Sequence, residues 1–197
     1  MKKHRMPKDS LVLNKPNQIK ALADPLRYRV FELLTMEART AKQTAEYMGV
    51  KPTRLYHHFG VLEKAGLIRK VKTRKVRGTV EKYYEAVAKK VVVDPDVLGK
   101  KALPLSSLYA AALQATLEEI LDVERAAVDA SQEPPVQLVR LKIRTTQTKI
   151  QELQSKLEEW VETCQESSSE EGDREYGITV AFYQMAENFS KEERNES

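Results

Sequence analysis

Residues 21–87 have the sequence ALADPLRYRVFELLTMEARTAKQTAEYMGVKPTRLYHHFGVLEKAGLIRKVKTRKVRGTVEKYYEAV. Apolar residues recur at helical spacing through most of this stretch. Toward its end, two runs rich in valine, tyrosine and basic residues flank a single Arg-Gly turn signal, which is the pattern of a two-stranded hairpin. The stretch therefore predicts the order helix, helix, turn, helix and hairpin.

Start and stop signals separate the predicted helices. Asp24 and Pro25 predict the start of a helix that runs from Leu26 to about Met36. Thr40 with Gln43 matches a capping box for a helix over residues 41–48, and a further helix opens at Lys51-Pro52-Thr53 and ends near Ala65. Glycine is typical of the position just after a helix, and two glycines follow these last two helices: Gly49 and Gly66.

The helix over residues 52–65 divides into two faces at about 100° per residue. Leu55, Phe59 and Leu62 share one face, and Gly60 on the opposite face would let the backbone approach a partner closely. Hydroxyl, imidazole and cationic groups surround Gly60, and such groups bind base edges and phosphates in a major groove. A merely solvated face would usually carry more glutamate. The residues that we predict to contact DNA from this helix are Lys51, Thr53, Arg54, Tyr56, His57 and Lys64.

The hairpin that follows is strongly basic. Residues 69–82 contain seven Lys and Arg against one acid, Glu81. Lysines also protect the edges of sheets, but seven cations exceed what edge protection needs. We expect a wing that lies along the phosphate backbone or enters the minor groove. Its predicted contact residues are Lys72, Arg74, Lys75 and Arg77.

The overall charge of +4 conceals a split along the chain. Residues 1–101 hold 24 Lys and Arg against 10 Asp and Glu, a net of +14, whereas residues 102–197 hold 9 against 19, a net of −10. A basic first half favours a polyanionic partner, and an acidic second half favours self-association or regulation. No stretch approaches the roughly 20 apolar residues of a membrane span. We therefore expect a soluble, cytoplasmic protein without a membrane partner.

The predicted fold class is mainly α with α+β elements. We expect a flexible basic arm over 1–14, a DNA-binding domain over 15–92, a linker over 93–104, a dimerisation and effector region over 105–190 and a disordered tail over 191–197. Periodicity in the second half predicts helices over 105–130 and 145–165, and strands over 136–144 and 176–185. The second half would thus be helix, strand, helix, strand, and the helix over 105–130 would form the dimer.

Residues 21–87 resemble the winged helix-turn-helix domain of the ArsR-type family of prokaryotic transcription regulators. The likeness covers about 70 of the 197 residues. It implies a homodimer that binds a roughly palindromic operator and usually represses transcription. The residues that carry the likeness are Ala21–Arg27, Thr40–Ala45, Tyr56–Ile68 and the end of the wing at Tyr83-Tyr84.

The chain departs from the metal-sensing members of that family. Those members carry cysteines in the helix before the recognition helix, or Asp and His ligands on the dimerisation helix. Here residues 41–48 lack cysteine and residues 105–130 lack histidine, while His57 and His58 diverge by about 100° on their helix. We expect no metal and no cofactor, and we interpret His58 as a histidine packed within the domain.

Cys164, the single cysteine, lies on an apolar seam with Ile150, Leu153, Leu157 and Trp160. Such a cysteine is more often a small buried apolar side chain than a redox switch acting through an intersubunit disulfide.

These patterns predict a transcription regulator that binds double-stranded DNA, and the resemblance implies that it is a repressor acting as a homodimer. The alternative is a winged helix that serves as a protein–protein interaction module in a larger assembly. Such modules generally lose the basic surface that this chain keeps. The sequence offers no catalytic dyad and no glycine-rich loop, so we expect no enzyme. The region over 105–190 is also where an unidentified small-molecule or protein effector could bind.

Overall fold

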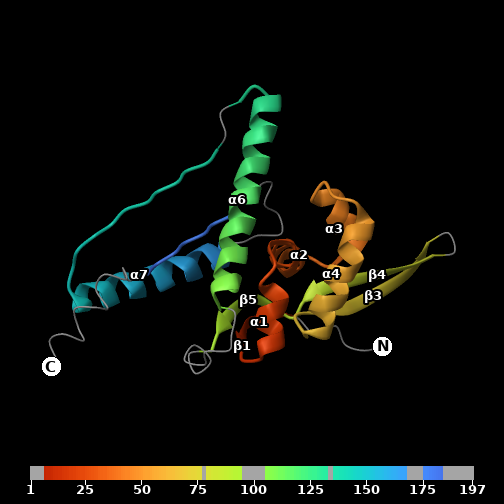
Figure 1. The fold of residues 1–197 in the computed structure, drawn as a ribbon, viewed down its shortest axis with the longest axis horizontal. Coiled ribbons are helices and arrows are strands. Elements are labelled where there is room, and N and C mark those ends of the chain that lie inside the picture. The colour runs from red at the N-terminus through yellow and green to blue at the C-terminus, as the bar shows by residue number, and fades with distance from the viewer. Residues whose placement is uncertain (1–6, 77–78, 95–104, 133–134, 168–174, 184–197) are drawn as a thin grey trace. The chain divides into compact units, whose positions relative to one another are not determined.

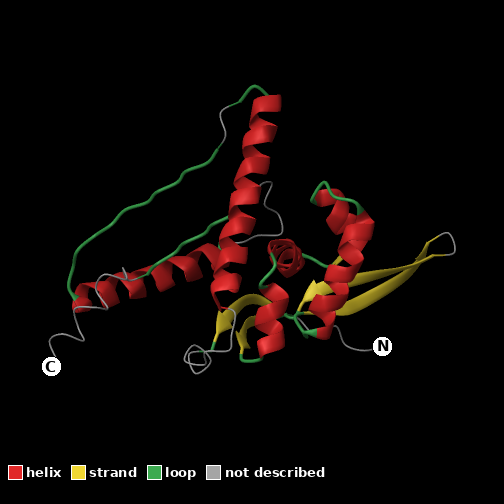
Figure 2. Cartoon of the chain, viewed as in Figure 1, coloured by secondary structure: helices red, strands yellow, loops and turns green. Residues whose placement is uncertain are grey.

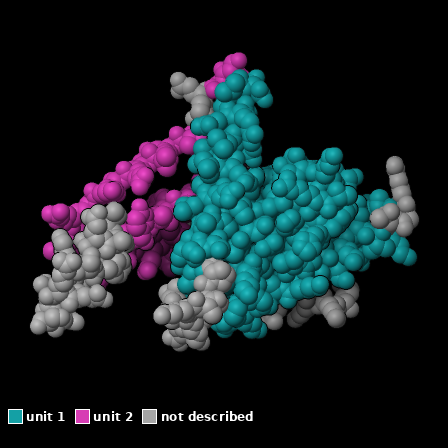
Figure 3. All heavy atoms as spheres, viewed as in Figure 1, with its two compact units in different colours: residues 1–129 teal, residues 130–197 magenta. Residues whose placement is uncertain are grey.

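The computed structural model describes residues 7–76, 79–94, 105–132, 135–167 and 175–183 (Figure 1). It divides into two compact units, residues 1–129 and residues 130–197, which Figure 3 shows in different colours. Helices dominate the described part of the chain, and two small sheets lie in the first unit. The predicted fold class, mainly α with a winged helix-turn-helix at the N-terminal side, is confirmed.

The helical part of the first unit follows the predicted caps. Asp24 starts its helix by accepting a hydrogen bond from the backbone N–H of Arg27 at 2.9 Å. Thr40 and Gln43 form the predicted capping box, with reciprocal hydrogen bonds of 3.1 and 2.9 Å. The elements are α1 (Pro16–Leu22), α2 (Pro25–Met36), β2 (Arg39–Thr40), α3 (Ala41–Tyr47) and α4 (Pro52–Lys64).

The hairpin after α4 is the predicted wing. β3 (Ile68–Val76) pairs antiparallel with β4 (Thr79–Ala86), and β2 pairs with the other edge of β4, which gives the order β2-β4-β3. Gly66, with a φ of 73°, supplies the left-handed residue between α4 and β3. The turn itself, at Arg77-Gly78, lies outside the described residues.

The N-terminal segment is not a flexible arm where the structure describes it. β1 (Lys8–Leu13) pairs in parallel with β5 (Ala88–Val93), and Leu13 is fully buried. The prediction for residues 1–14 is therefore wrong over this strand. The error has a physical reason, because the two strands are about 80 residues apart in sequence and a six-residue strand has no strong local signal. The expected linker lies mostly outside the described residues.

Helix α6 (Leu105–Asp129) packs on the winged helix and belongs to the same compact unit. Its Leu108 joins the main core, and two small side chains, Ala111 and Ala115, are buried as well. Arg29 of α2 lies 3.4, 3.5 and 3.0 Å from the carboxylates of three α6 residues: Glu118, Glu119 and Asp122. The compact units thus separate at residues 129–130 and not within the linker that we expected over 93–104.

The second unit contains α7 (Gln147–Glu166) between two extended segments, 135–146 and 175–183. Figure 2 draws both segments as loops, and neither belongs to a strand ladder in the part of the chain that the structure describes. The predicted strands over 136–144 and 176–183 are therefore not formed, and residues 184–185 lie outside the described residues. Alternation makes a segment suitable for a sheet, but a ladder also needs a neighbouring strand. On the seam of α7, Cys164 is half-buried and Trp160 is exposed.

Candidate nucleic-acid interface

Helix α4 has one buried and one exposed face, as its sequence predicts. Leu55, Phe59 and Leu62 are buried in the main core. The ring of Phe59 meets that of Tyr84 in β4 edge to face, with the ring centroids 5.3 Å apart. The apolar face therefore fixes α4 against the sheet and leaves its opposite face outward.

The six residues predicted to contact DNA from this helix are all exposed: Lys51, Thr53, Arg54, Tyr56, His57 and Lys64. Gly60 lies among them, and a Cβ atom added there would meet no other described protein atom within 4 Å. Packing within the protein therefore does not require glycine at this position. Exposure makes these side chains available to a ligand.

His58 joins α4 to the junction of α1 and α2. Its side chain is only 16% exposed, and its Nδ1 lies 3.7 Å from Oδ1 of Asp24, the residue that caps α2. Burial lowers the pKa of His58, while the carboxylate of Asp24 acts in the opposite direction. The guanidinium of Arg27 binds the same junction by donating to the backbone carbonyls of Ala21 and Lys20. The interpretation of His58 as a packed histidine agrees with this geometry.

The wing presents exposed cations along β3. Lys72, Arg74 and Lys75 are exposed, whereas Arg77 lies outside the described residues. The register between β3 and β4 shifts between Lys70 and Lys72, as in a β-bulge, and a bulge of this kind changes where the following side chains point. Three of the four predicted wing contacts are thus placed on the surface.

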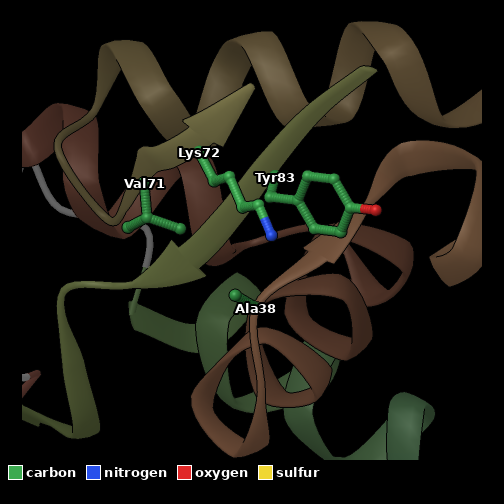
Figure 4. A pocket seen from close by; sticks show the side chains of 4 residues that line it. All are labelled: Ala38, Val71, Lys72 and Tyr83. Atoms are coloured by element: carbon green, nitrogen blue, oxygen red, sulfur yellow. The ribbon is translucent and has the colours of Figure 1, made fainter. Parts of the chain in front are cut away.

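The ammonium group of Lys72 is positioned by an aromatic ring. Its Nζ lies 5.6 Å from the centroid of the Tyr83 ring, within the range of a cation–π interaction. Figure 4 shows both side chains at an open hollow, with Ala38 and Val71 as its other lining residues. Tyr83 was not predicted as a partner of Lys72, because the bulge that brings the two residues opposite each other has no clear sequence signal.

Two acidic residues of β4 lie beside cations of β3 and limit how freely those cations can bind an anionic ligand. Arg69 donates from Nε to Oε1 of the buried Glu85 at 2.8 Å, so this arginine closes the base of the wing. Glu81 lies directly opposite Arg74 in the strand register and places a negative charge beside a predicted phosphate contact. One cation at the base of the wing, Arg69, is therefore paired, and a second, Arg74, faces an acid across the strands.

Within the described ranges, no three His, Cys, Asp or Glu side chains gather where they could hold a metal ion. No helix in those same ranges has both the length and the apolar character that a membrane span requires.

Parts of this chain are similar to known proteins. Residues 22–71 match the family described as a helix-turn-helix domain. A similar solved structure is the homodimeric winged helix-turn-helix DNA-binding domain, fragment 1–100, of a possible ArsR-family transcriptional regulator from Mycobacterium bovis. It is 18% identical, covers 52% of this chain and 76% of its own, and has a TM-score of 0.31. No curated protein matches the chain. Residues 22–71 thus contain a helix-turn-helix, and the structure adds the two-stranded wing of β3 and β4 after it.

Proposed function

We propose that this protein is a sequence-specific regulator of transcription in the cytoplasm that binds double-stranded DNA as a homodimer and represses at a roughly palindromic operator. Helix α4 enters the major groove, and the wing contacts the backbone or the minor groove. The single observation that carries the proposal is the division of α4, whose apolar face is buried while its polar and cationic face is uncovered beside a basic hairpin.

The electrostatics of the first unit support this role. The exposed cations of α4 and β3 lie in the half of the chain whose net charge is +14, so the region attracts a polyanion at long range. Arg54 and the hydroxyl and imidazole groups around it supply donors and acceptors for base edges. The cations of the wing supply contacts that do not depend on sequence.

Helix α6 supports the homodimer. An apolar stripe, which we call the α6 stripe, recurs every four residues on its exposed side and consists of Tyr109, Leu113, Leu117 and Leu121. Helices that associate in pairs bury a stripe of this kind. Pairing two DNA-binding units multiplies the affinity for two half-sites, which is the energetic reason for a dimer on a palindrome.

The test is selection from a randomised duplex pool at two salt concentrations, followed by sequencing of the retained DNA. An enriched palindrome, with binding that weakens steeply as salt rises, is the expected result. Weak binding at low salt without enrichment would overturn the proposal and favour a protein-interaction module, with the wing as a partner surface.

Two matched variants then test the assignment of α4. Arg54→Ala should reduce affinity for the selected site by about 1–3 kcal/mol, roughly five- to 150-fold, and should affect random DNA less. Arg125→Ala removes an exposed arginine from α6 and should change neither affinity. Equal losses on selected and random DNA for Arg54→Ala would contradict its role in base recognition.

A further inference from the structure

The two segments that precede and follow α7 in the sequence expose many apolar side chains. In segment 135–146, Leu138 is 84% exposed and Val139 is 70% exposed, and in segment 175–183, Tyr176 is 76% exposed. The remaining exposed apolar side chains of the two segments are Val136, Leu141, Ile143, Ile178, Val180, Phe182 and Tyr183. Folded proteins rarely leave so many neighbouring apolar groups in water unless another surface covers them.

Each segment has the alternation of a strand with one apolar face. Odd positions of the first segment carry Val139, Leu141 and Ile143, while its even positions from 140 to 144 are all basic. In the second segment the even positions are apolar, from Tyr176 to Phe182, and the odd positions between them are small or polar. Each segment can therefore place its apolar face against the seam of α7 and its other face in water.

One copy of the chain provides too little for a stable sheet. The two segments are joined through α7, a crossover that puts two strands side by side and parallel. A two-stranded sheet is marginal in water, and three or more strands with a covered face are needed for independent stability. The described part of the second unit offers no third strand. A second copy supplies two more strands and a second helix under one two-fold axis.

The charges decide which segment lies at that axis. Arg140, Lys142 and Arg144 would oppose like charges if the first segments of two copies paired with each other. The same residues suit an outer strand, because lysine and arginine protect exposed edges from further pairing. The second segment carries small or uncharged side chains from residue 176 to residue 183, so two copies of it can pair without repulsion.

We propose that residues 175–183 of two copies of this chain pair antiparallel at the centre of a four-stranded intermolecular sheet, with residues 136–144 of each copy as its outer strands and the two α7 helices on one face. This sheet is a second contact between copies besides the α6 stripe. It extends the proposed homodimer but does not depend on the DNA-binding role.

The test is a cysteine scan of the full-length chain in a Cys164→Ser background, with one cysteine at a time over residues 176–183. Paired strands bring opposed Cβ atoms to about 4.5–5.5 Å, whereas outer strands of a four-stranded sheet lie about 14 Å apart, three strand spacings. We expect disulfides between copies at one or two neighbouring positions in this segment. Cysteines at residues 137, 139, 141 and 143 are the controls and should not link.

A second measurement follows the backbone by amide hydrogen exchange. Amides of residues 176–183 should exchange slowly in the unmodified protein. Ala181→Lys places like charges from the two copies near the two-fold axis and should abolish that protection. Leu138→Lys is the matched control: it adds a lysine to the same face of the sheet, the one turned away from α7, but on the outer strand, and it should preserve the protection. Rapid exchange in the unmodified protein, absence of links over 176–183, or links at the control positions would each overturn the proposal.

The DNA selection distinguishes this inference from the proposed function. Enrichment of a palindrome without links over 176–183 would reject the intermolecular sheet and leave the regulator intact. Links without enrichment would leave the sheet standing and reject the DNA-binding role.

Discussion

Replacing Gly60 by alanine separates what α4 needs in order to fold from what it needs in order to bind. Glycine inside a helix is less favourable than alanine by about 1 kcal/mol. The added Cβ would meet no described protein atom within 4 Å, so no steric cost offsets this gain. We expect Gly60→Ala to stabilise the protein by about 0.5–1 kcal/mol, which raises Tm by roughly 1–4 °C for a chain of this size.

The same substitution should weaken DNA binding. Gly60 shares the outward face of α4 with His57 and Lys64, so a methyl group there would hold the helix away from the groove. We expect affinity for the selected site to fall about tenfold, about 1.4 kcal/mol. Calorimetric melting and fluorescence titration of the same preparation would measure both effects. A lower Tm would refute the packing argument, and an unchanged affinity would refute the close approach of Gly60 to DNA.

Three other perturbations test the wing, the helix junction and the α6 contact. Arg74→Ala should weaken binding equally on specific and random DNA and lower the slope of log affinity against log salt by about one. In the same titrations Glu81→Gln, which removes the negative charge opposite Arg74, should raise the affinity for both kinds of DNA several-fold. Because burial lowers the pKa of His58 below its unfolded value of 6.5, unfolding takes up a proton in acid, so Tm should fall as pH drops below about 6.5, and His58→Gln should flatten that dependence. Arg29→Met leaves three carboxylates without their arginine and should cost about 1–3 kcal/mol in urea unfolding at neutral pH, with a smaller loss in acid. If Asp122→Asn, which removes only one of the three carboxylates, lowered the free energy of unfolding as much as Arg29→Met, a single ion pair would account for the whole stabilisation.

Local signals predicted the winged helix well. The capping box of Thr40 and Gln43 and the glycines that end α3 and α4 act through neighbouring residues, so a single segment contains the whole interaction. The two faces of α4 follow from helical spacing alone, because Leu55, Phe59 and Leu62 point to one side in any α-helix. The candidate contact residues of this helix followed from the same argument, and their binding role remains a prediction.

Features that depend on distant partners were missed. β1 forms because it finds β5 far along the chain, and its own six residues do not indicate that pairing. Arg69 is paired with Glu85 and so is less available to a ligand, and this pair forms only when the register of β3 against β4 places the two residues opposite each other. The two alternating segments of the second unit show the reverse case, because their pattern is present but, in our proposal, their sheet is stable only when a second copy adds two more strands.

The packing of α6 on the winged helix also decides where this chain can be divided into stable fragments. Leu108 completes the core that holds α2 and α4, and Arg29 ties α2 to three acidic residues of α6. A fragment cut after the wing would lose both contacts and expose the side of α2 that α6 covers. The winged helix is therefore not an exchangeable cassette. Anyone grafting it onto another protein must carry α6 as far as Asp122 with it, and a chimaera joined before residue 105 would have a damaged core.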